Sequence, residues 1–324
     1  MKRILSKGLN NKGAAIITVI LIISILVAAG LELNRASRLD VHDAANLSDG
    51  IRLAYVAKSG FYGAAALVLN ARGDYDSLRE AWANAEVLSA QSTQLFTHAY
   101  FIVRVEDEKG KIPLNKLVEG SAVNAHVRGL LVRLLSLPEF GLDEKQAGET
   151  VDAIIDWIDA NDEVTGAGAE GAWYEAQAFP YTAKNAPLDC IEELLMIRGI
   201  TGELYAGTRD KPGLAQYVTI YGTGAININT APKMVLRALS DKITADIADK
   251  MDEYRKADGN DLSSVLWYKR VSGLENETIE PNLIENLKSD YFRIVATGVA
   301  DNMEQTITGV IKRSPFQIVY WRLD

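Results

Sequence analysis

The feature of this sequence that most constrains its fold is an uninterrupted apolar run near its start. Residues 14–31 read AAIITVILIISILVAAGL and contain no charged side chain. Eighteen helical residues span about 27 Å, close to the hydrocarbon thickness of a bilayer. Residues 1–13 are basic and contain no acid, and positive charge favours the cytoplasmic side of a membrane. We therefore expect one transmembrane helix, with residues 1–13 in the cytoplasm and the remaining chain exported.

Two ordinary interpretations of this segment are a simple signal anchor and a cleaved secretory signal, for which Ala28-Ala29-Gly30 resembles a cleavage site. A more specific string lies on the near side of the run. Lys12 and Gly13 directly precede it, which resembles the prepilin peptidase site of type IV pilins and type II secretion pseudopilins. The resemblance implies cleavage after Gly13, a methylated N-terminus at Ala14, and an apolar helix that stays in the mature protein.

The fifth position after this junction departs from the usual pattern of those families. Most members carry glutamate there, and this chain carries Thr18. The resemblance implies that the glutamate engages the N-terminus of a neighbouring subunit during assembly. Its absence favours a subunit that is used once and does not repeat along a filament.

Apolar residues recur every three to four positions after the run, from Leu33 to Tyr55, on a charged background. This spacing predicts that the helix continues beyond the membrane. A second helical stretch is expected at about residues 50–70, loosened by Gly60 and Gly63. The apolar stripe from Leu33 to Tyr55 is expected to pack against equivalent helices of partner subunits.

Strand patterns lie at two distant places in the chain. Aromatic and β-branched residues with period-two character predict strands at residues 99–106, 291–299, 304–311 and 316–321. Residues 111–115 are expected to begin a strand that returns along the first one. Between these places the pattern is helical, so we predict an α+β fold. A long N-terminal helix packs on a small antiparallel sheet, which a large all-α insertion interrupts.

Several strings, in this order and spacing, resemble the general secretion pathway protein K family, the large minor pseudopilin of type II secretion. Besides the Gly13-Ala14 junction they are Asp107-Glu108-Lys109-Gly110-Lys111 with Leu114-Asn115, Asp156-Trp157-Ile158-Asp159, Gly168-Ala169-Glu170, Pro187-Leu188 with Glu193-Leu194, and Asn227-Ile228-Asn229-Thr230-Ala231-Pro232. The resemblance covers nearly the whole chain. It implies a prepilin leader (1–13), a transmembrane and assembly helix (14–31), a pilin-like α+β domain (32–117 and 286–324) and an inserted helical domain (118–285).

The resemblance also implies a role. Such a protein caps or initiates the tip of a periplasmic pseudopilus, with the minor pseudopilins I and J as partners, and supports export of folded proteins through the outer membrane. Its other expected partners are the prepilin peptidase, the pseudopilus and the inner-membrane assembly platform. The implied location is the inner membrane, single-pass, with the C-terminal bulk in the periplasm.

Residues 156–175 crowd carboxylates into a glycine-rich stretch, DWIDANDEVTGAGAEGAWYE. Oxygen ligands on a flexible loop suit Ca²⁺, although the spacing is not that of an EF-hand, and a solvated acidic loop is the alternative. The resemblance implies calcium in this domain. Our candidate metal ligands are Asp159, Asp162, Glu163 and Glu170, and we expect Asp152 and Asp156 to face solvent.

Nucleic-acid binding, a signal-anchored periplasmic enzyme and a type IV pilus minor pilin are the rival functions. Residues 195–202 resemble a helix–hairpin–helix turn, but residues 120–285 hold 15 Lys and Arg against 27 Asp and Glu, a net charge of −12 that repels phosphate. No catalytic constellation surrounds the three histidines, and the single Cys190 is expected to be structural. We therefore expect no enzyme, no nucleic-acid partner and no small-molecule substrate. The helical insertion favours secretion over a pilus.

Overall fold

The first helix, α1 (Asn11–Asn70), is a single continuous rod of 60 residues. It comes from a computed structural model of the chain, which describes residues 11–120 and 122–324. Residues 1–10 of the expected leader lie outside the described residues. The expectation of a separate, loosened stretch at residues 50–70 is wrong. Gly60 and Gly63 serve close packing instead, because a Cβ on Gly60 would lie 2.8 Å from the Phe101 ring and one on Gly63 would lie 3.0 Å from Leu88.

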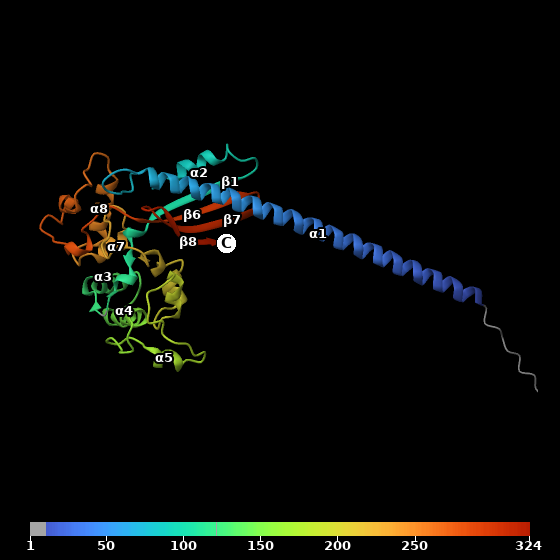
Figure 1. The fold of residues 1–324 in the computed structure, drawn as a ribbon, viewed down its shortest axis with the longest axis horizontal. Coiled ribbons are helices and arrows are strands. Elements are labelled where there is room, and N and C mark those ends of the chain that lie inside the picture. The colour runs from blue at the N-terminus through green and yellow to red at the C-terminus, as the bar shows by residue number, and fades with distance from the viewer. Residues whose placement is uncertain (1–10, 121) are drawn as a thin grey trace, which may run out of the picture.

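The main sheet contains four antiparallel strands in the order β1-β6-β7-β8. Their bounds are Tyr100–Asp107 for β1, Tyr291–Ala300 for β6, Met303–Lys312 for β7 and Gln317–Leu323 for β8. All four strands that the sequence pattern predicts are therefore present, each displaced by two residues or fewer at either end. Strand β1 pairs with strands from the C-terminal end of the chain in one sheet, so the segment between β1 and β6 is an insertion (Figure 1).

Helix α1 lies on one face of this sheet, and two glycines let it approach closely. A Cβ on Gly298 of β6 would lie 2.4 Å from the carbonyl oxygen of Leu53, and one on Gly309 of β7 would lie 2.6 Å from the Phe61 ring. Alternate residues of β6 point into this interface, as expected for a strand with one covered face. Side chains of α1 are buried from Leu53 onward. The larger, N-terminal part of α1 projects away from the sheet (Figure 1).

A short helix, α2 (Glu86–Ser92), packs beside β1 at the edge of the sheet. Between α1 and α2 the buried Trp82 ring packs edge-on against Phe292 of β6, with centroids 5.0 Å apart. This pair joins the segment after α1 to the middle of the sheet.

The chain turns out of the main sheet directly after β1. Asp107 ends β1 and its side chain accepts a hydrogen bond from the Lys109 amide at 2.9 Å, which caps the 3₁₀ turn η1 (Glu108–Gly110). The expectation that residues 111–115 begin a returning strand is wrong. Instead β2 (Ile112–Pro113) pairs in parallel with β5 (Val218–Thr219), deep in the insertion.

Most of the regular secondary structure of the insertion is helical, and the insertion has its own core. Its α-helices are α3 (Ala125–Leu135), α4 (Glu144–Ile158), α5 (Gly171–Glu175), α6 (Gly202–Ala206), α7 (Lys233–Ala238) and α8 (Ala245–Lys256). Its 3₁₀ turns are η2 (Leu114–Lys116), η3 (Ile191–Met196), η4 (Leu214–Gln216), η5 (Val265–Arg270) and η6 (Pro281–Leu283), and β3 (Val118–Glu119) pairs with β4 (Ala122–Val123).

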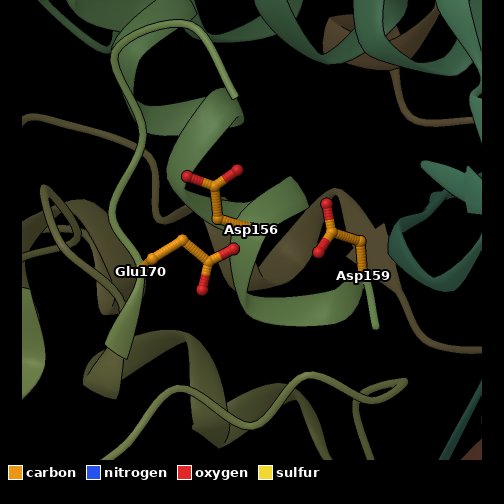
Figure 2. Close-up of side chains that lie close together, drawn as sticks. All are labelled: Asp156, Asp159 and Glu170. Atoms are coloured by element: carbon orange, nitrogen blue, oxygen red, sulfur yellow. The ribbon is translucent and has the colours of Figure 1, made fainter. Parts of the chain in front are cut away.

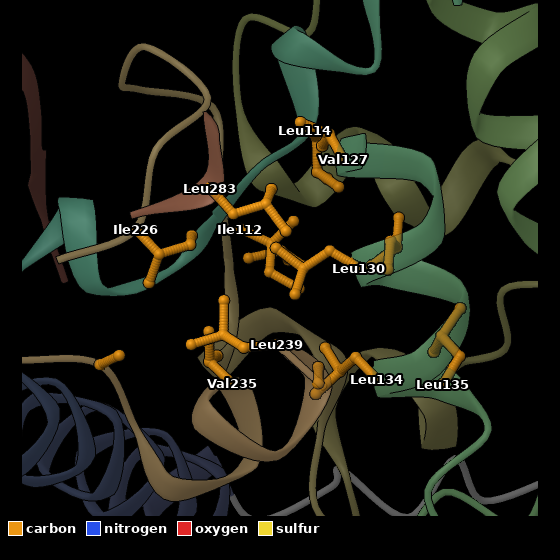
Figure 3. Close-up of a cluster of buried hydrophobic side chains, with 14 of the residues drawn as sticks. Ile112, Leu114, Val127, Leu130, Leu134, Leu135, Ile226, Val235, Leu239 and Leu283 are labelled. Atoms are coloured by element: carbon orange, nitrogen blue, oxygen red, sulfur yellow. The ribbon is translucent and has the colours of Figure 1, made fainter. Parts of the chain in front are cut away.

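Leucines of α3 meet residues from both ends of the insertion in this core (Figure 3). Ile112 and Leu114, near the first end, pack in the same cluster as Leu283, near the last. A separate core lies between α1 and the main sheet. The insertion core thus includes Ile112 and Leu114, which precede the expected boundary at residue 118.

Candidate functional site

The candidate site begins on one face of α4. A capping box starts this helix, since the Asp143 side chain and Gln146 bond each other's backbone amides. Asp152, Asp156 and Asp159 follow at spacings of four and three residues, which places them on the same side of the helix. All three are buried, and Asp156 is fully so. The expectation that Asp152 and Asp156 face solvent is wrong.

The loop after α4 folds back and covers this face. The Thr165 amide donates to Asp156 Oδ1 at 2.8 Å, and the Ala167 amide donates to Asp152 Oδ2 at 3.3 Å. Asp152 also pairs with the Arg128 guanidinium at 2.7 Å. The negative charge of Asp152 is therefore compensated within the protein.

Two glycines make this close covering possible. Gly166 has a positive φ of 56°, and a Cβ there would lie 2.3 Å from Asp152 Oδ2. A Cβ on Gly168 would lie 2.1 Å from Asp156 Oδ2. No side chain larger than hydrogen fits at either position while the carboxylates keep their places.

Glu170 completes the site from the far end of the loop. One carboxylate oxygen each from Asp156, Asp159 and Glu170 lies within 4.8 Å of the others, and the side chains of Asp159 and Glu170 point toward each other (Figure 2). Asp156 Oδ2 and both carboxylate oxygens of Glu170 are buried and have no hydrogen-bond partner among the described residues. Among the residues that the structure describes, no lysine or arginine forms an ion pair with any of the three.

The electrostatics of this cluster reflect crowded negative charge. Burial, followed by the charges of Asp156 and Asp159, raises the pKa of Glu170 to about 7. Burial also raises the pKa of Asp156 and of Asp159. Buried carboxylates without partners are costly, and a bound cation would remove that cost. Several oxygen donors converging on one point are the ligand type that Ca²⁺ takes.

The structure brings together two of the four metal ligands expected from the sequence, Asp159 and Glu170. Asp162 and Glu163 are exposed and lie outside the group, and Asp162 accepts a hydrogen bond from Asn185 at 2.8 Å. Asp156 was missed, although its helical spacing from Asp159 is visible in the sequence. The binding of a metal by any of these residues remains a prediction.

A second functional element is the projecting part of α1. From Ala15 onward it is long and apolar enough to cross a membrane, with a mean hydropathy of 2.7 in its most apolar window, and none of that window is buried. The expected processing residues Gly13 and Ala14 lie in α1, but their side chains are outside the described ones. Leu33, Leu47 and Tyr55 of the expected stripe are all exposed. The stripe is therefore available to a partner.

Comparison with known proteins gives one consistent result. Two family models described as Type II secretion system (T2SS), protein K match residues 110–222 and 226–284, together more than half of the chain. The Type II secretion system protein K of Aeromonas hydrophila is 26% identical over 231 residues, which make up 67% of this chain and 66% of that protein. The chain thus spans just under two thirds of that relative.

A putative type II secretion system protein K of Escherichia coli K12 is 34% identical over 89 residues, covering 28% of this chain and 25% of that protein. The fold resembles a chain in the crystal structure of the GspK-GspI-GspJ complex from the enterotoxigenic Escherichia coli type 2 secretion system. The TM-score is 0.65 at 18% identity, and the match covers 88% of this chain and 99% of that one. This chain belongs to the type II secretion system protein K family.

Proposed function

We propose that this chain is a minor pseudopilin that caps or initiates the pseudopilus tip of a type II secretion system, in complex with the minor pseudopilins I and J. The observation that carries the proposal is that two unlike parts of the chain lie at opposite ends of the main sheet. An exposed apolar rod leaves one end of the sheet, and a bulky domain occupies the other end (Figure 1). Family membership and the similarity to a chain of the GspK-GspI-GspJ complex support it.

The insertion explains why such a subunit would stand at a tip. It is built from the 183 residues between β1 and β6 and has its own core. Repeated stacking along a tight helical filament would require room for this domain at every step. At the end of the filament no subunit lies above it. The role is structural, and we assign the chain no catalytic activity.

Processing by prepilin peptidase is part of the proposal and rests on the Gly13-Ala14 junction. The leader would stay in the cytoplasm, and the mature chain would face the periplasm with α1 in the inner membrane. Mass spectrometry of the chain expressed with its peptidase should find a methylated N-terminus at Ala14. Gly13→Val should leave the leader attached. An N-terminus beyond Gly30 would instead assign the segment to a secretory signal.

Complex formation tests the tip role. Full-length chain co-expressed with the I and J subunits should co-purify with both from detergent-solubilised membranes. Leu47→Asp, which places a charge on the exposed stripe, should reduce the yield of the complex without changing the fold. Asp49→Asn changes a charge on the opposite side of α1, since it is exposed and lies two residues from Leu47, and serves as the control. Failure to form any complex would count against the tip role.

A second assay separates secretion from a pilus. Deletion of the gene should abolish release of exported proteins through the outer membrane and should leave twitching motility intact. Loss of motility with normal release would favour a type IV pilus minor pilin instead.

We also propose that the cluster of Asp156, Asp159 and Glu170 binds Ca²⁺. Unpartnered, buried carboxylate oxygens that converge within 4.8 Å support this assignment. When bound, the ion would neutralise the three carboxylates and fix the loop to α4. Titration calorimetry of the chelator-treated chain should show calcium binding that Asp159→Ala abolishes. Asp162→Ala and Glu163→Ala test whether the exposed acids of the loop contribute to calcium binding. If the unmutated chain gives no heat of binding, the proposed calcium site is refuted.

A further inference from the structure

The two edges of the main sheet differ in whether their outward backbone groups are hydrogen-bonded. At the β1 edge, two serines of α2 form hydrogen bonds with backbone groups of β1 that point away from β6. Ser92 Oγ accepts from the Phe101 amide at 3.0 Å, and its own hydroxyl lies within hydrogen-bond distance of two carbonyl oxygens, that of Ser89 at 2.6 Å and that of Phe101 at 3.2 Å. Ser89 Oγ accepts from the Val103 amide at 2.9 Å. Backbone groups that are already bonded cannot pair with another strand, so α2 closes the Phe101–Val103 stretch of this edge.

Among residues 11–120 and 122–324, none covers the β8 edge in this way. Asp324 and Thr306 exchange two backbone hydrogen bonds, at 2.9 and 3.0 Å. Backbone groups of an antiparallel strand point alternately toward and away from its neighbour, so those of Trp321 and Leu323 point away from β7. Among the described residues no atom donates to or accepts from these outward groups. They form a short row of free donors and acceptors at the edge.

Side chains beside this row are also uncovered. Trp321 is 41% exposed and Leu323 is 51% exposed, both large apolar residues. The buried Phe61 ring lies edge-on to the Trp321 ring, with centroids 4.9 Å apart, and to the Tyr62 ring at 5.6 Å. Tyr62 is itself 44% exposed. Tryptophan and tyrosine held firmly on a buried ring are typical anchors of protein interfaces.

The position of the β8 edge along α1 indicates which kind of partner would reach it. Trp321 pairs with Gly309, which lies against Phe61, and further along the sheet Gly298 lies against Leu53. The end of β8 therefore lies beside the part of α1 where burial stops and the exposed stripe, Leu33 to Tyr55, begins (Figure 1). A subunit whose helix packs along the stripe would bring its own globular part next to β8.

We infer that the β8 edge, at Trp321 and Leu323, is the docking site for an extended strand of a neighbouring pilin-type subunit. The inference rests on the proposed function and specifies the mode of contact: backbone pairing gives the register, and the Trp321 and Tyr62 side chains receive the apolar residues of the added strand. The bulge in the β7–β8 pairing lies between Val310 and Ile311, toward the other end of β8, so the strand is regular at its free edge.

Hydrogen exchange tests the backbone pairing directly. The full-length chain is measured alone and in the co-purified complex with the I and J subunits. Amide exchange in the peptide spanning residues 317–324 should slow at least about tenfold on complex formation. The peptide containing Phe101 and Val103 should not change, because its edge is already closed by α2. Unchanged exchange at residues 317–324 in a stable complex would overturn the inference and leave the proposed function intact.

A pair of variants separates backbone pairing from side-chain contact. Leu323→Pro removes an amide that faces away from β7, so the sheet keeps its internal bonds. Leu323→Ala removes the same side chain and keeps the amide. We expect the proline variant to bind the I and J subunits at least about tenfold more weakly than the alanine variant. Equal affinities would overturn the inference.

Two other outcomes are decisive. Exchange protection that appears in the chain alone and grows with its own concentration would assign the edge to a second copy of this chain, against the inference. If no complex forms with the I and J subunits, the proposed function fails and the inference fails with it.

Discussion

Replacing Asp156 by asparagine should have effects of opposite sign with and without calcium. In the ion-free protein Asp156 adds a third negative charge to a buried cluster with no compensating cation among the described residues. The amide of asparagine can still accept the Thr165 hydrogen bond at Oδ1. The substitution therefore removes repulsion and keeps the local structure. In calcium it removes a charged ligand.

The distances set the magnitude. Two unit charges 4.8 Å apart repel by roughly 3 kcal/mol at an effective dielectric constant of 20. Partial protonation and solvent screening reduce this, so we expect Asp156→Asn to stabilise the ion-free protein by about 1–2 kcal/mol. With a Kd near 10⁻⁴ M, 1 mM calcium stabilises the unmutated chain by about 1.4 kcal/mol. A tenfold weaker site retains about 0.4 kcal/mol.

Thermal unfolding in chelator measures the stability of the ion-free protein, and unfolding in 1 mM calcium measures the added stabilisation by the ion. Trp157, whose ring lies 5.2 Å from that of Tyr174, reports on the insertion through its fluorescence. Glu175→Gln changes an exposed acid of the same region and should leave the Tm unchanged both in chelator and in calcium. A lower Tm for Asp156→Asn in chelator would refute the electrostatic reasoning. Equal calcium increments in both proteins would exclude Asp156 as a ligand.

Two further predictions concern the packing of α1 and the buried polar groups beside β1. Gly298→Ala should destabilise the chain by about 1–3 kcal/mol in thermal unfolding, because its Cβ would lie 2.4 Å from a backbone carbonyl of α1, whereas Gly50→Ala, which meets nothing within 4 Å, should not. Arg293 and Lys111 outweigh burial and lower the pKa of Glu108 to about 2 from 4.5, so its stabilisation is full above pH 4.5 and is lost as the pH falls toward 2. Glu108→Gln should therefore reduce the loss of stability between pH 7 and pH 2 by up to roughly 3 kcal/mol, as measured by unfolding over that range. An unchanged loss of stability at low pH would show that Glu108 does not stabilise the fold in this way.

The strands of the main sheet could be predicted because each carries its own signal. The alternation of apolar and polar residues at 291–299 and 304–311 requires only that one face of each strand be covered, whatever covers it. The error at residues 111–115 has a different origin. There the Asp107 side chain caps a turn and directs the chain into the insertion, where β5, about a hundred residues later, supplies the partner strand. Local pattern contains no information about such a distant partner.

The same distinction holds for the acidic site. Asp159 and Glu170 belong to a loop whose composition alone indicates oxygen ligands. Asp156 lies on a helix, where a charged residue usually faces solvent, and its burial depends on a loop that folds back over α4. Gly166 and Gly168 are the sequence signal of that close approach. Their meaning becomes clear only when the carboxylates beneath them are known.

Two of the strings that carry the family resemblance, residues 107–111 and 227–232, meet in the structure at the base of the insertion. The Asn227 amide donates to the Lys109 carbonyl oxygen at 2.9 Å, and the buried Asp107 accepts from Thr230 at 2.6 Å and from Ser289 at 2.6 Å. Each of these residues is buried, so none is available to a partner.

Their effect is to hold both ends of the insertion against the end of β1 and the start of β6 through short, buried hydrogen bonds. Such networks fix one orientation, because a displaced partner would leave a buried polar group unsatisfied. A relative with both strings should therefore hold its insertion at the same angle to α1. The exposed stripe of α1 and the β8 edge, by contrast, are accessible, and these are the surfaces that we propose for partner recognition.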